Sequence, residues 1–218
     1  MLAARPLVVL LCAVHTAALA QQAAININAE LLQAARRGSE ATVRSLLDQG
    51  AAVDSRNRLG DTPLNVAAKN GHTRLGLLLI ERGADVNQKD LAGVTPLMSA
   101  AYNGDLDLTR ALLQRKADLT PVDRMKKTAV LYAAANGHAR VLGALLEQGV
   151  DVNARYDNDL TALMWAAGFG QDEAVRVLLA RGAERDARDN RGKTALTIAE
   201  EQDRQSTAAL LRTAGAQK

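Results

Sequence analysis

Apolar and polar positions alternate along the chain with a period of 33 residues. A triplet of threonine, a small or proline residue and an apolar residue marks each period, followed by paired alanines and a glycine. A leucine-rich stretch and a second glycine complete the unit. The triplets occupy residues 62–64, 95–97, 128–130, 161–163 and 194–196. A fixed period of this length, without insertions, indicates a stack of similar structural units.

Each column of the repeat has a structural reason that predicts two short helices per unit. Threonine is a good N-cap because its hydroxyl accepts a free amide of the first turn, and proline suits the position after it. The first glycine separates the two helices, and the later glycine ends the second helix in a left-handed conformation. Leucines at 77–79, 112–113, 145–146 and 178–179 give the second helix an apolar face. A polar turn rich in Asn and Asp then leads to the next threonine.

Several segments resemble the ankyrin repeat. Gly93-Val94-Thr95-Pro96-Leu97 and the stretch 83–87 match its consensus closely, and Asn-Gly-His at 70–72 and 136–138 matches its central turn. The resemblance covers about residues 29–215. It implies an all-α, helix-turn-helix solenoid of about six repeats with β-hairpin-like fingers between them. We place the repeats near 29–61, 62–94, 95–127, 128–160, 161–193 and 194–218, after a leader at 21–28.

The departures from the ankyrin pattern carry their own predictions. The ankyrin family usually has a histidine three residues after the threonine. Here that position is occupied by Asn65, Met98, Leu131, Met164 and Thr197. We expect apolar packing to replace the hydrogen bonds of the histidine. Between the third and fourth units Lys116 replaces the terminal glycine, Thr120-Pro121 enters the loop, and the finger 123–127 lacks glycine. We expect a bend or weak point there. The first and last units are expected to act as caps, and in the last unit Glu200 replaces the second alanine and is followed by Glu201, Gln202 and Asp203.

The first twenty residues have the pattern of a secretory signal peptide. Arg5 provides the positive start, residues 7–14 are apolar, and Ala18-Leu19-Ala20 gives a small-x-small cleavage site. Cleavage would leave a chain that starts at Gln21 and lacks the sole cysteine, Cys12, which suits an oxidising compartment. An uncleaved anchor is the alternative. The excess of arginine over lysine and the absence of Asn-x-Ser/Thr favour a bacterial, periplasmic protein, with secretion from the cell as the alternative.

The composition argues against nucleic-acid binding. Hydrophobic residues make up 48% of the chain and charged residues 23%, which is typical of an ordered soluble protein. The net charge is only +3, from 27 basic and 24 acidic residues whose signs alternate along the chain. Nucleic-acid binding usually needs basic residues gathered on one face.

The sequence shows no constellation for catalysis, a metal or a cofactor. His72 and His138 lie in the Gly-His turns of repeats two units apart, so we expect them to begin helices rather than share a metal. The segment 157–159 hints at a calcium loop but lacks its glycine and its final glutamate. Neither a Gly-x-Ser-x-Gly elbow nor a phosphate-binding Gly-rich loop occurs.

In the ankyrin family, finger tips and the exposed side of each first helix line a concave face that meets partner proteins. Carried onto this sequence, the resemblance implies a partner-binding face made of Arg58, Leu59, Asp61, Lys69, Asn70, Leu91, Val94, Tyr102, Asn103, Arg124, Met125, Lys127, Asn136, Asp157, Asn158, Leu160, Phe169, Asn190, Arg191 and Lys193.

The aromatic residues support the same face independently of the resemblance. All five aromatics, Tyr102, Tyr132, Tyr156, Trp165 and Phe169, fall on predicted first helices or fingers, and aromatic side chains are enriched at binding hot spots. We expect Tyr132 and Trp165 to fill space between repeats. Tyr102 and Phe169, together with Leu91 and Met125, are expected to be exposed.

These features predict a non-catalytic periplasmic scaffold that docks a partner protein on its concave face. We expect it to be a monomer that is not bound to a membrane after signal cleavage. An immunity or neutralising partner, or a secreted effector acting on another protein, is the second hypothesis. A structural, self-associating role and an enzyme are further alternatives. The identity of the partner does not follow from the fold, because repeat surfaces vary on a fixed framework.

Overall fold

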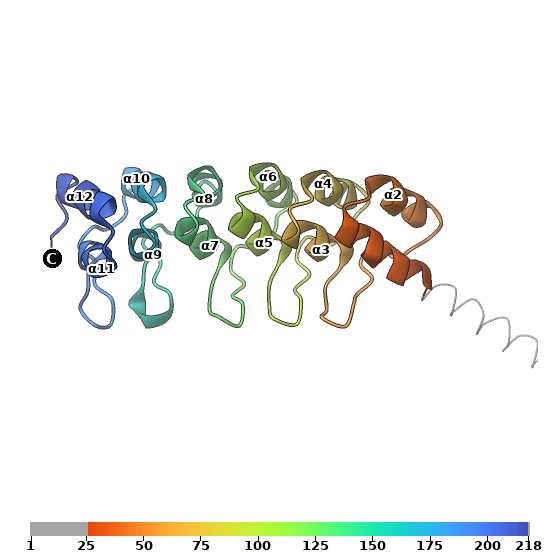
Figure 1. The fold of residues 1–218 in the computed structure, drawn as a ribbon, viewed down its shortest axis with the longest axis horizontal. Coiled ribbons are helices and arrows are strands. Elements are labelled where there is room, and N and C mark those ends of the chain that lie inside the picture. The colour runs from red at the N-terminus through yellow and green to blue at the C-terminus, as the bar shows by residue number, and fades with distance from the viewer. Residues whose placement is uncertain (1–25, 218) are drawn as a thin grey trace, which may run out of the picture.

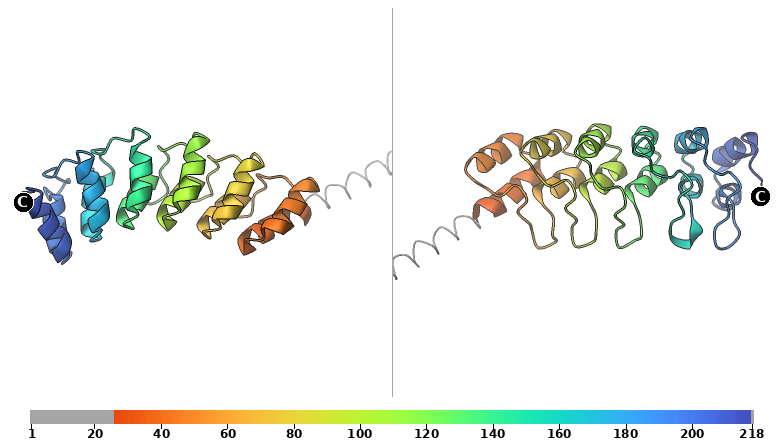
Figure 2. Two further views of the ribbon diagram at one scale, coloured as in Figure 1. Left: turned by 90° about the horizontal axis from the view of Figure 1, so that it is seen from above. Right: turned by 180° about the vertical axis from the view of Figure 1, so that it is seen from behind.

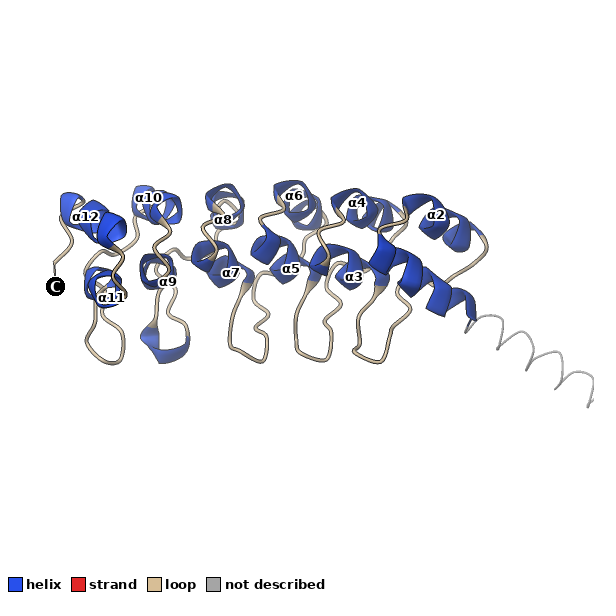
Figure 3. Ribbon diagram, viewed as in Figure 1, coloured by secondary structure: helices blue, strands red, loops and turns tan. Residues whose placement is uncertain are grey.

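The structure is a computed structural model, and it describes residues 26–217 of the 218-residue chain. Within this range all regular elements are helices, and no residue lies in a β-strand. The helices form pairs that stack in a single row, and loops project from one side of the row (Figures 1 and 3). Seen from above, the row is gently curved (Figure 2). The predicted all-α solenoid is confirmed. The predicted signal peptide at 1–20 lies outside the described residues.

Each pair contributes one helix to each of two layers, and helices of the same layer contact each other along the row. The first helices, nearest to the fingers, are residues 26–37, α3 (Pro63–Lys69), α5 (Pro96–Asn103), α7 (Ala129–Ala135), α9 (Ala162–Gly168) and α11 (Ala195–Glu201). The second helices are α2 (Glu40–Asp48), α4 (Thr73–Glu81), α6 (Leu106–Gln114), α8 (Ala139–Leu146), α10 (Asp172–Ala180) and α12 (Gln205–Thr213). A short 3-10 helix, η1 (Asp157–Asp159), occupies one finger.

The repeated threonines begin the first helices, as predicted. In all five, the hydroxyl oxygen accepts the backbone N–H three residues later, at 3.2–3.4 Å. The threonine backbone is extended, and the helix begins at the next residue. Each such cap contributes about 1 kcal/mol to stability. The five threonines are Thr62, Thr95, Thr128, Thr161 and Thr194.

The core runs the length of the stack as a layer of small and branched side chains. The paired alanines of the first helices are at most 1% exposed; they are residues 67–68, 100–101, 133–134 and 166–167. Their small volume lets neighbouring first helices approach closely, and fully buried leucines such as Leu108, Leu142 and Leu145 fill the space toward the second helices. Burial of one such leucine is worth about 1.5–3 kcal/mol. The scarcity of aromatics is therefore compatible with a continuous core.

The expectation that apolar packing replaces hydrogen bonds in the family-histidine column is wrong at Asn65. Met98, Leu131 and Met164 are indeed buried. The Asn65 amide, however, is fully buried and donates to the backbone oxygen of Gln88, in the loop that leads to the next repeat, at 3.0 Å. An asparagine satisfies this position because its side chain has both a donor and an acceptor, and its oxygen accepts the N–H of Thr62 at 3.1 Å.

Neighbouring loops are joined by hydrogen bonds at two levels: beside the second helices and at the finger tips. On the level nearer the second helices, the side chains of Asp54, Asn87, Asn153 and Asp186 each accept the N–H of the residue 31 positions later, at 2.6–3.1 Å. At the finger tips, backbone N–H groups of residues 91, 124 and 190 donate to carbonyls of the preceding finger at 2.9–3.1 Å. These bonds fix the spacing of the repeats.

This ladder is interrupted once within the described residues, between the loops 115–127 and 148–160. Thr120 occupies the position of Asn87, and its hydroxyl donates to the Asp118 carboxylate at 2.8 Å instead of reaching the next loop. No finger-tip bond joins these two loops either. A cavity of about 450 Å³ opens between them, lined by Leu119, Val122, Val130, Val150 and Tyr156 among others. The irregular third-to-fourth junction predicted from sequence thus has few polar links.

Lys116 adds backbone strain at this same junction. It has φ +59° at the position where the other repeats end their second helices with glycine, whose φ is +85° at Gly83 and Gly149. A side chain in the left-handed region costs about 1–2 kcal/mol relative to glycine. The weak point proposed from sequence stays a prediction.

Candidate partner-binding face

Five loops form the fingers, and an Asx side chain holds four of them closed. The first residue of the finger accepts, through one side-chain oxygen, the N–H groups two and four residues later, at 2.8–3.0 Å. The residues concerned are Asn57, Asp90, Asp123 and Asp189. Each of these fingers also has a backbone bond between its first and fifth residues, so it is hairpin-like although no strand is assigned.

The fourth finger lacks the Asx side chain because Tyr156 occupies the position where the others have Asn or Asp. Its backbone turns instead through η1, with φ +60° at both Asn158 and Asp159. Burial is the main cause that raises the pKa of the Tyr156 hydroxyl above its usual value. This finger therefore presents a different surface from the other four.

We define the finger-side face as the five fingers (57–61, 90–94, 123–127, 156–160, 189–193) with the exposed sides of the first helices. All six exposed large apolar side chains of the described residues lie on this face or on the loop leading into it, and none is on a second helix. They are Leu59, Leu91, Tyr102, Val122, Met125 and Phe169, exposed by 47–67%. The predicted exposure of Tyr102, Phe169, Leu91 and Met125 is confirmed. Apolar groups gathered on one side indicate an interaction surface.

Four aromatic rings and one lysine form a continuous row on this face, which we call the aromatic strip: Tyr102, Tyr132, Lys127, Trp165 and Phe169. The Tyr102 and Tyr132 rings meet edge to face with centroids 5.7 Å apart. Lys127 Nζ lies 5.6 Å from the Tyr132 centroid and 4.9 Å from that of Trp165, in cation–π contact with both. The Trp165 and Phe169 rings stack at 5.9 Å. The strip crosses three repeats, from α5 to the end of α9.

The inner members of the strip are partly buried and anchored, whereas its ends are free. Tyr132 and Trp165 pack against the core, as predicted. The Tyr132 hydroxyl also donates to the carboxylate of Asp123. Burial, aided by this bond, raises the pKa of Tyr132 far above its usual value, so the hydroxyl stays protonated. Tyr102 and Phe169 are 54% and 51% exposed, so they are available for contact.

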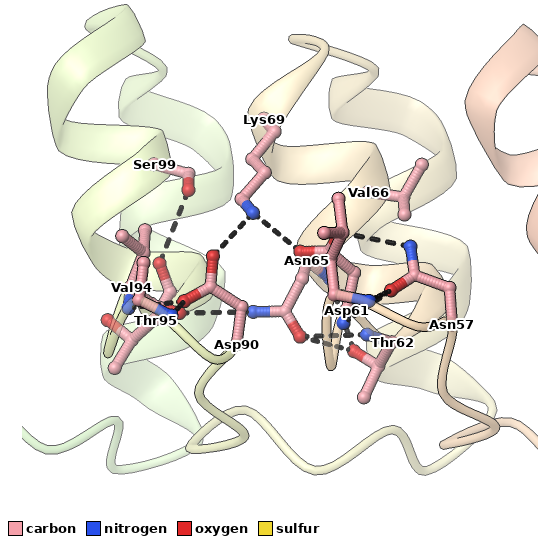
Figure 4. Close-up of polar contacts among 12 residues, drawn as sticks. Asn57, Asp61, Thr62, Asn65, Val66, Lys69, Asp90, Val94, Thr95 and Ser99 are labelled. Carbon is pink, nitrogen blue, oxygen red and sulfur yellow. Dashed lines mark hydrogen bonds and ion pairs between the residues drawn. The ribbon is translucent and has the colours of Figure 1, made fainter.

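A polar cluster borders the strip toward the N-terminus. Lys69 Nζ lies 2.5 Å from Asp61 Oδ1 and 2.6 Å from Asp90 Oδ2 (Figure 4). Burial alone would lower the pKa of Lys69, but the bonds to both carboxylates outweigh it and raise the pKa. For Asp90, burial is likewise outweighed by Lys69 and by the N–H groups of Val94 and Ala92, which hold its pKa below the usual value.

The residues predicted for this face differ in solvent exposure. Val94, Lys127 and Leu160 are half-buried. Asp61, expected on the surface, is only 4% exposed because it bonds to Lys69 and to the Asn57 amide. The exposed members are Arg58, Leu59, Lys69, Asn70, Leu91, Tyr102, Asn103, Arg124, Met125, Asn136, Asp157, Asn158, Phe169, Asn190 and Arg191.

Several of these polar side chains serve the fold itself. The Asn103 amide donates to the carbonyl of Ala68 in the preceding repeat at 2.9 Å. Arg191 is bonded to the buried carboxylate of Asp189 at 2.8 Å, and the half-buried Lys193 is paired with Glu201 at 2.5 Å. The histidines of the Gly-His turns act similarly, since a ring nitrogen of His138 lies 2.9 Å from the Tyr102 carbonyl oxygen. These residues position the face rather than extend it.

The described residues contain no group of three His, Cys, Asp or Glu side chains placed to hold a metal. None of the helices in residues 26–217 is both long and apolar enough to cross a bilayer.

Comparison with known proteins assigns the architecture. A family model described as ankyrin repeats (three copies) matches residues 7–90, 77–156 and 132–218. An ankyrin repeat domain from Acinetobacter baumannii AYE has a similar structure, with a TM-score of 0.75 and 33% identity over 86% of this chain and 98% of that one. The human ASB11 ankyrin repeat domain is also similar, with a TM-score of 0.79 and 27% identity over 86% of this chain and 84% of that one. No curated protein matches.

The chain belongs to the ankyrin repeat family. Ankyrin repeats generally mediate protein–protein interaction, and their domains are typically non-catalytic scaffolds. The exposed apolar side chains of the finger-side face are consistent with that general role.

Proposed function

We propose that this protein is a non-catalytic scaffold of the bacterial periplasm that docks a partner protein on the finger-side face. The observation that carries the proposal is the gathering of exposed apolar side chains on this face, with none on a second helix of the described residues. Within it, Tyr102 and Phe169 are the anchors: large, half-exposed rings held in place by Tyr132 and Trp165. Pre-positioned rings lose little freedom on binding, which favours affinity.

The contact is tested by capture of partners from a periplasmic extract, with mass spectrometry, using the wild type and two variants. Tyr102→Ala with Phe169→Ala should weaken capture by about 1–2 kcal/mol, or roughly 5- to 30-fold in Kd. Arg110→Ala with Arg140→Ala, exposed positions on the second helices α6 and α8, is the matched control and should retain full binding. Equal yields from the two double variants would refute the assignment of the face.

The periplasmic location rests on the sequence pattern of residues 1–20. Fractionation of bacterial cells producing the full chain should place the protein in the periplasm, and N-terminal sequencing should begin at Gln21. Retention in the membrane fraction with an intact N-terminus would support the uncleaved anchor, and recovery from the medium would support secretion.

A further inference from the structure

A cavity lies at the N-terminal end of the finger-side face. It has a volume of about 680 Å³ between the helix 26–37 and the first finger loop. The helix extends toward the level of the fingers, where a preceding repeat would have placed a finger (Figure 1). Ala29, Leu32 and Val66 make the lining partly apolar. Arg58 lines the cavity, and the next residue in the chain, Leu59, is the first of the exposed apolar residues.

Three arginines line this cavity, and its charge is largely unbalanced. Arg36 and Arg58 form no ion pair with any described residue, and Arg56 is hydrogen-bonded only to the neutral amide of Gln88. One carboxylate lines the cavity, that of Asp54, and it accepts the N–H of Asp85 at 3.1 Å.

The neighbouring repeat shows what counter-charge this arrangement lacks. Arg36 occupies the same repeat position as Lys69, which is held by Asp61 and Asp90 (Figure 4). One repeat earlier, the positions of those two carboxylates are taken by Asn28 and Asn57, and both line the cavity. Both acids are thus replaced by neutral amides; Asn57 occupies the same finger turn as Asp90, whereas Asn28 lies within the helix 26–37.

Neither the segment before the cavity nor the glutamates of the last repeat are placed to supply the missing charge. Residues 1–25 contain no Asp or Glu, so the preceding segment cannot supply a carboxylate side chain. In the last repeat, Glu200 and Glu201 are already paired with Arg212 and Lys193 at 2.5 Å, which disfavours insertion of the last repeat of a second copy. A carboxylate brought by another protein would form charge-assisted bonds with the planar guanidinium of Arg36.

We propose that this cavity receives an acidic segment of the partner protein, with one carboxylate bonded to Arg36 and an adjacent apolar side chain on Leu32 and Val66. The proposal rests on the docking function given above and extends it by naming the chemistry of the partner. The acidic segment and the surface contacting the aromatic strip then belong to the same partner.

The experiment selects octapeptides from a random display library on the full-length mature protein, with counter-selection on Arg36→Gln. Sequences that depend on Arg36 should contain Asp or Glu next to an apolar residue. A selected peptide, labelled with fluorescein, should lose at least about tenfold in affinity with Arg36→Gln, and as much when its acids are changed to amides. Binding should weaken as salt is raised.

Asn57→Asp is the sharper variant because it leaves Arg36 in place and keeps the side-chain oxygen that closes the finger. It should supply the internal carboxylate that Asp90 gives Lys69, and so exclude the peptide while the fold remains intact by thermal melting. Arg110→Gln is the control and should bind normally. Failure to enrich any Arg36-dependent sequence, enrichment of sequences without acids, or full binding by Asn57→Asp would each overturn the proposal.

The two proposals fail separately. If peptide binding is absent but partner capture still depends on Tyr102 and Phe169, the proposal of an acidic segment is refuted and the proposal of the docking face is retained. If peptide binding depends on Arg36 but partner capture is unaffected by loss of both rings, the proposed binding at the cavity is supported and the role of the two rings as anchors is refuted.

Discussion

Replacing Thr120 by asparagine should restore the missing rung of the loop ladder. At the intact junction, the Asn87 side chain accepts the N–H of Asp118 at 2.8 Å. The backbone on either side is alike, because the N–H of residue 87 and that of Thr120 each bond to an aspartate two residues earlier at 2.9 Å. An asparagine at 120 would therefore point toward the N–H of Asp151, which has no bond within the described residues.

The gain should be that of one solvent-exposed hydrogen bond. A typical intramolecular bond contributes about 0.5–1.5 kcal/mol, and the exposure of this loop favours the lower half of that range. For a chain of this length, 1 kcal/mol corresponds to about 2–4 °C in Tm. Urea unfolding gives the global change, and hydrogen exchange at the Asp151 amide reports the local one, since stacked repeats can open in segments.

Asn87→Thr is the matched reverse change and should lose about the same free energy while the Asp118 amide exchanges faster. The reasoning is refuted if Asn87→Thr destabilises the protein as stated but Thr120→Asn neither raises stability nor slows exchange at Asp151. The two loops would then be held apart by something other than the missing side chain.

Three further changes test the framework by urea unfolding. Gly104→Ala should cost at least about 1–2 kcal/mol, because φ is +71° and the added Cβ would lie 2.5–2.8 Å from the His138 ring. Lys116→Gly should gain about 0.5–1 kcal/mol, because relief of the left-handed backbone, about 1–2 kcal/mol, exceeds the extra conformational entropy that glycine loses on folding, about 0.5–1 kcal/mol. Asp90→Asn should cost about 1 kcal/mol at pH 7 by breaking the ion pair with Lys69. Because the folded-state pKa of Asp90 is lowered, its contribution is complete above the unfolded value and lost as pH falls through the folded pKa, so wild type should lose stability below about pH 4 more steeply than the variant.

Gly83→Ala is the control for the glycine prediction. Its φ of +85° imposes similar backbone strain, but an added Cβ would meet no atom within 4 Å. The excess cost of Gly104→Ala over Gly83→Ala therefore isolates the collision with His138. Equal costs would show that the ring moves aside freely.

The helix pairs and their caps could be predicted from sequence because they depend on local contacts. Threonine caps the amide three residues later, and a glycine with positive φ ends a helix, wherever the repeat sits in the stack. The exposure of Tyr102 and Phe169 was predictable from their columns for the same reason. A period without insertions carries each local rule through all repeats.

The polar organisation of the face could not be predicted because it depends on how neighbouring repeats are placed. Asp61 reads as a surface residue, yet it is buried against Lys69, which reaches across to Asp90. The insertion of Lys127 between the rings of two successive repeats also needs their spacing. One signal was present in the sequence: the recurrence of Asn or Asp at the first finger position marks the side chains that close the fingers.

The most direct test of the docking face is photo-crosslinking in cells that produce the protein with its native partners. A photoreactive phenylalanine analogue is placed singly at Tyr102, at Phe169, and at the exposed control positions Arg110 and Arg176 on α6 and α10. We predict that both finger-side positions link to the same protein and that neither control position does. Crosslinks to that protein from Arg110 or Arg176, with none from Tyr102 or Phe169, would contradict the account.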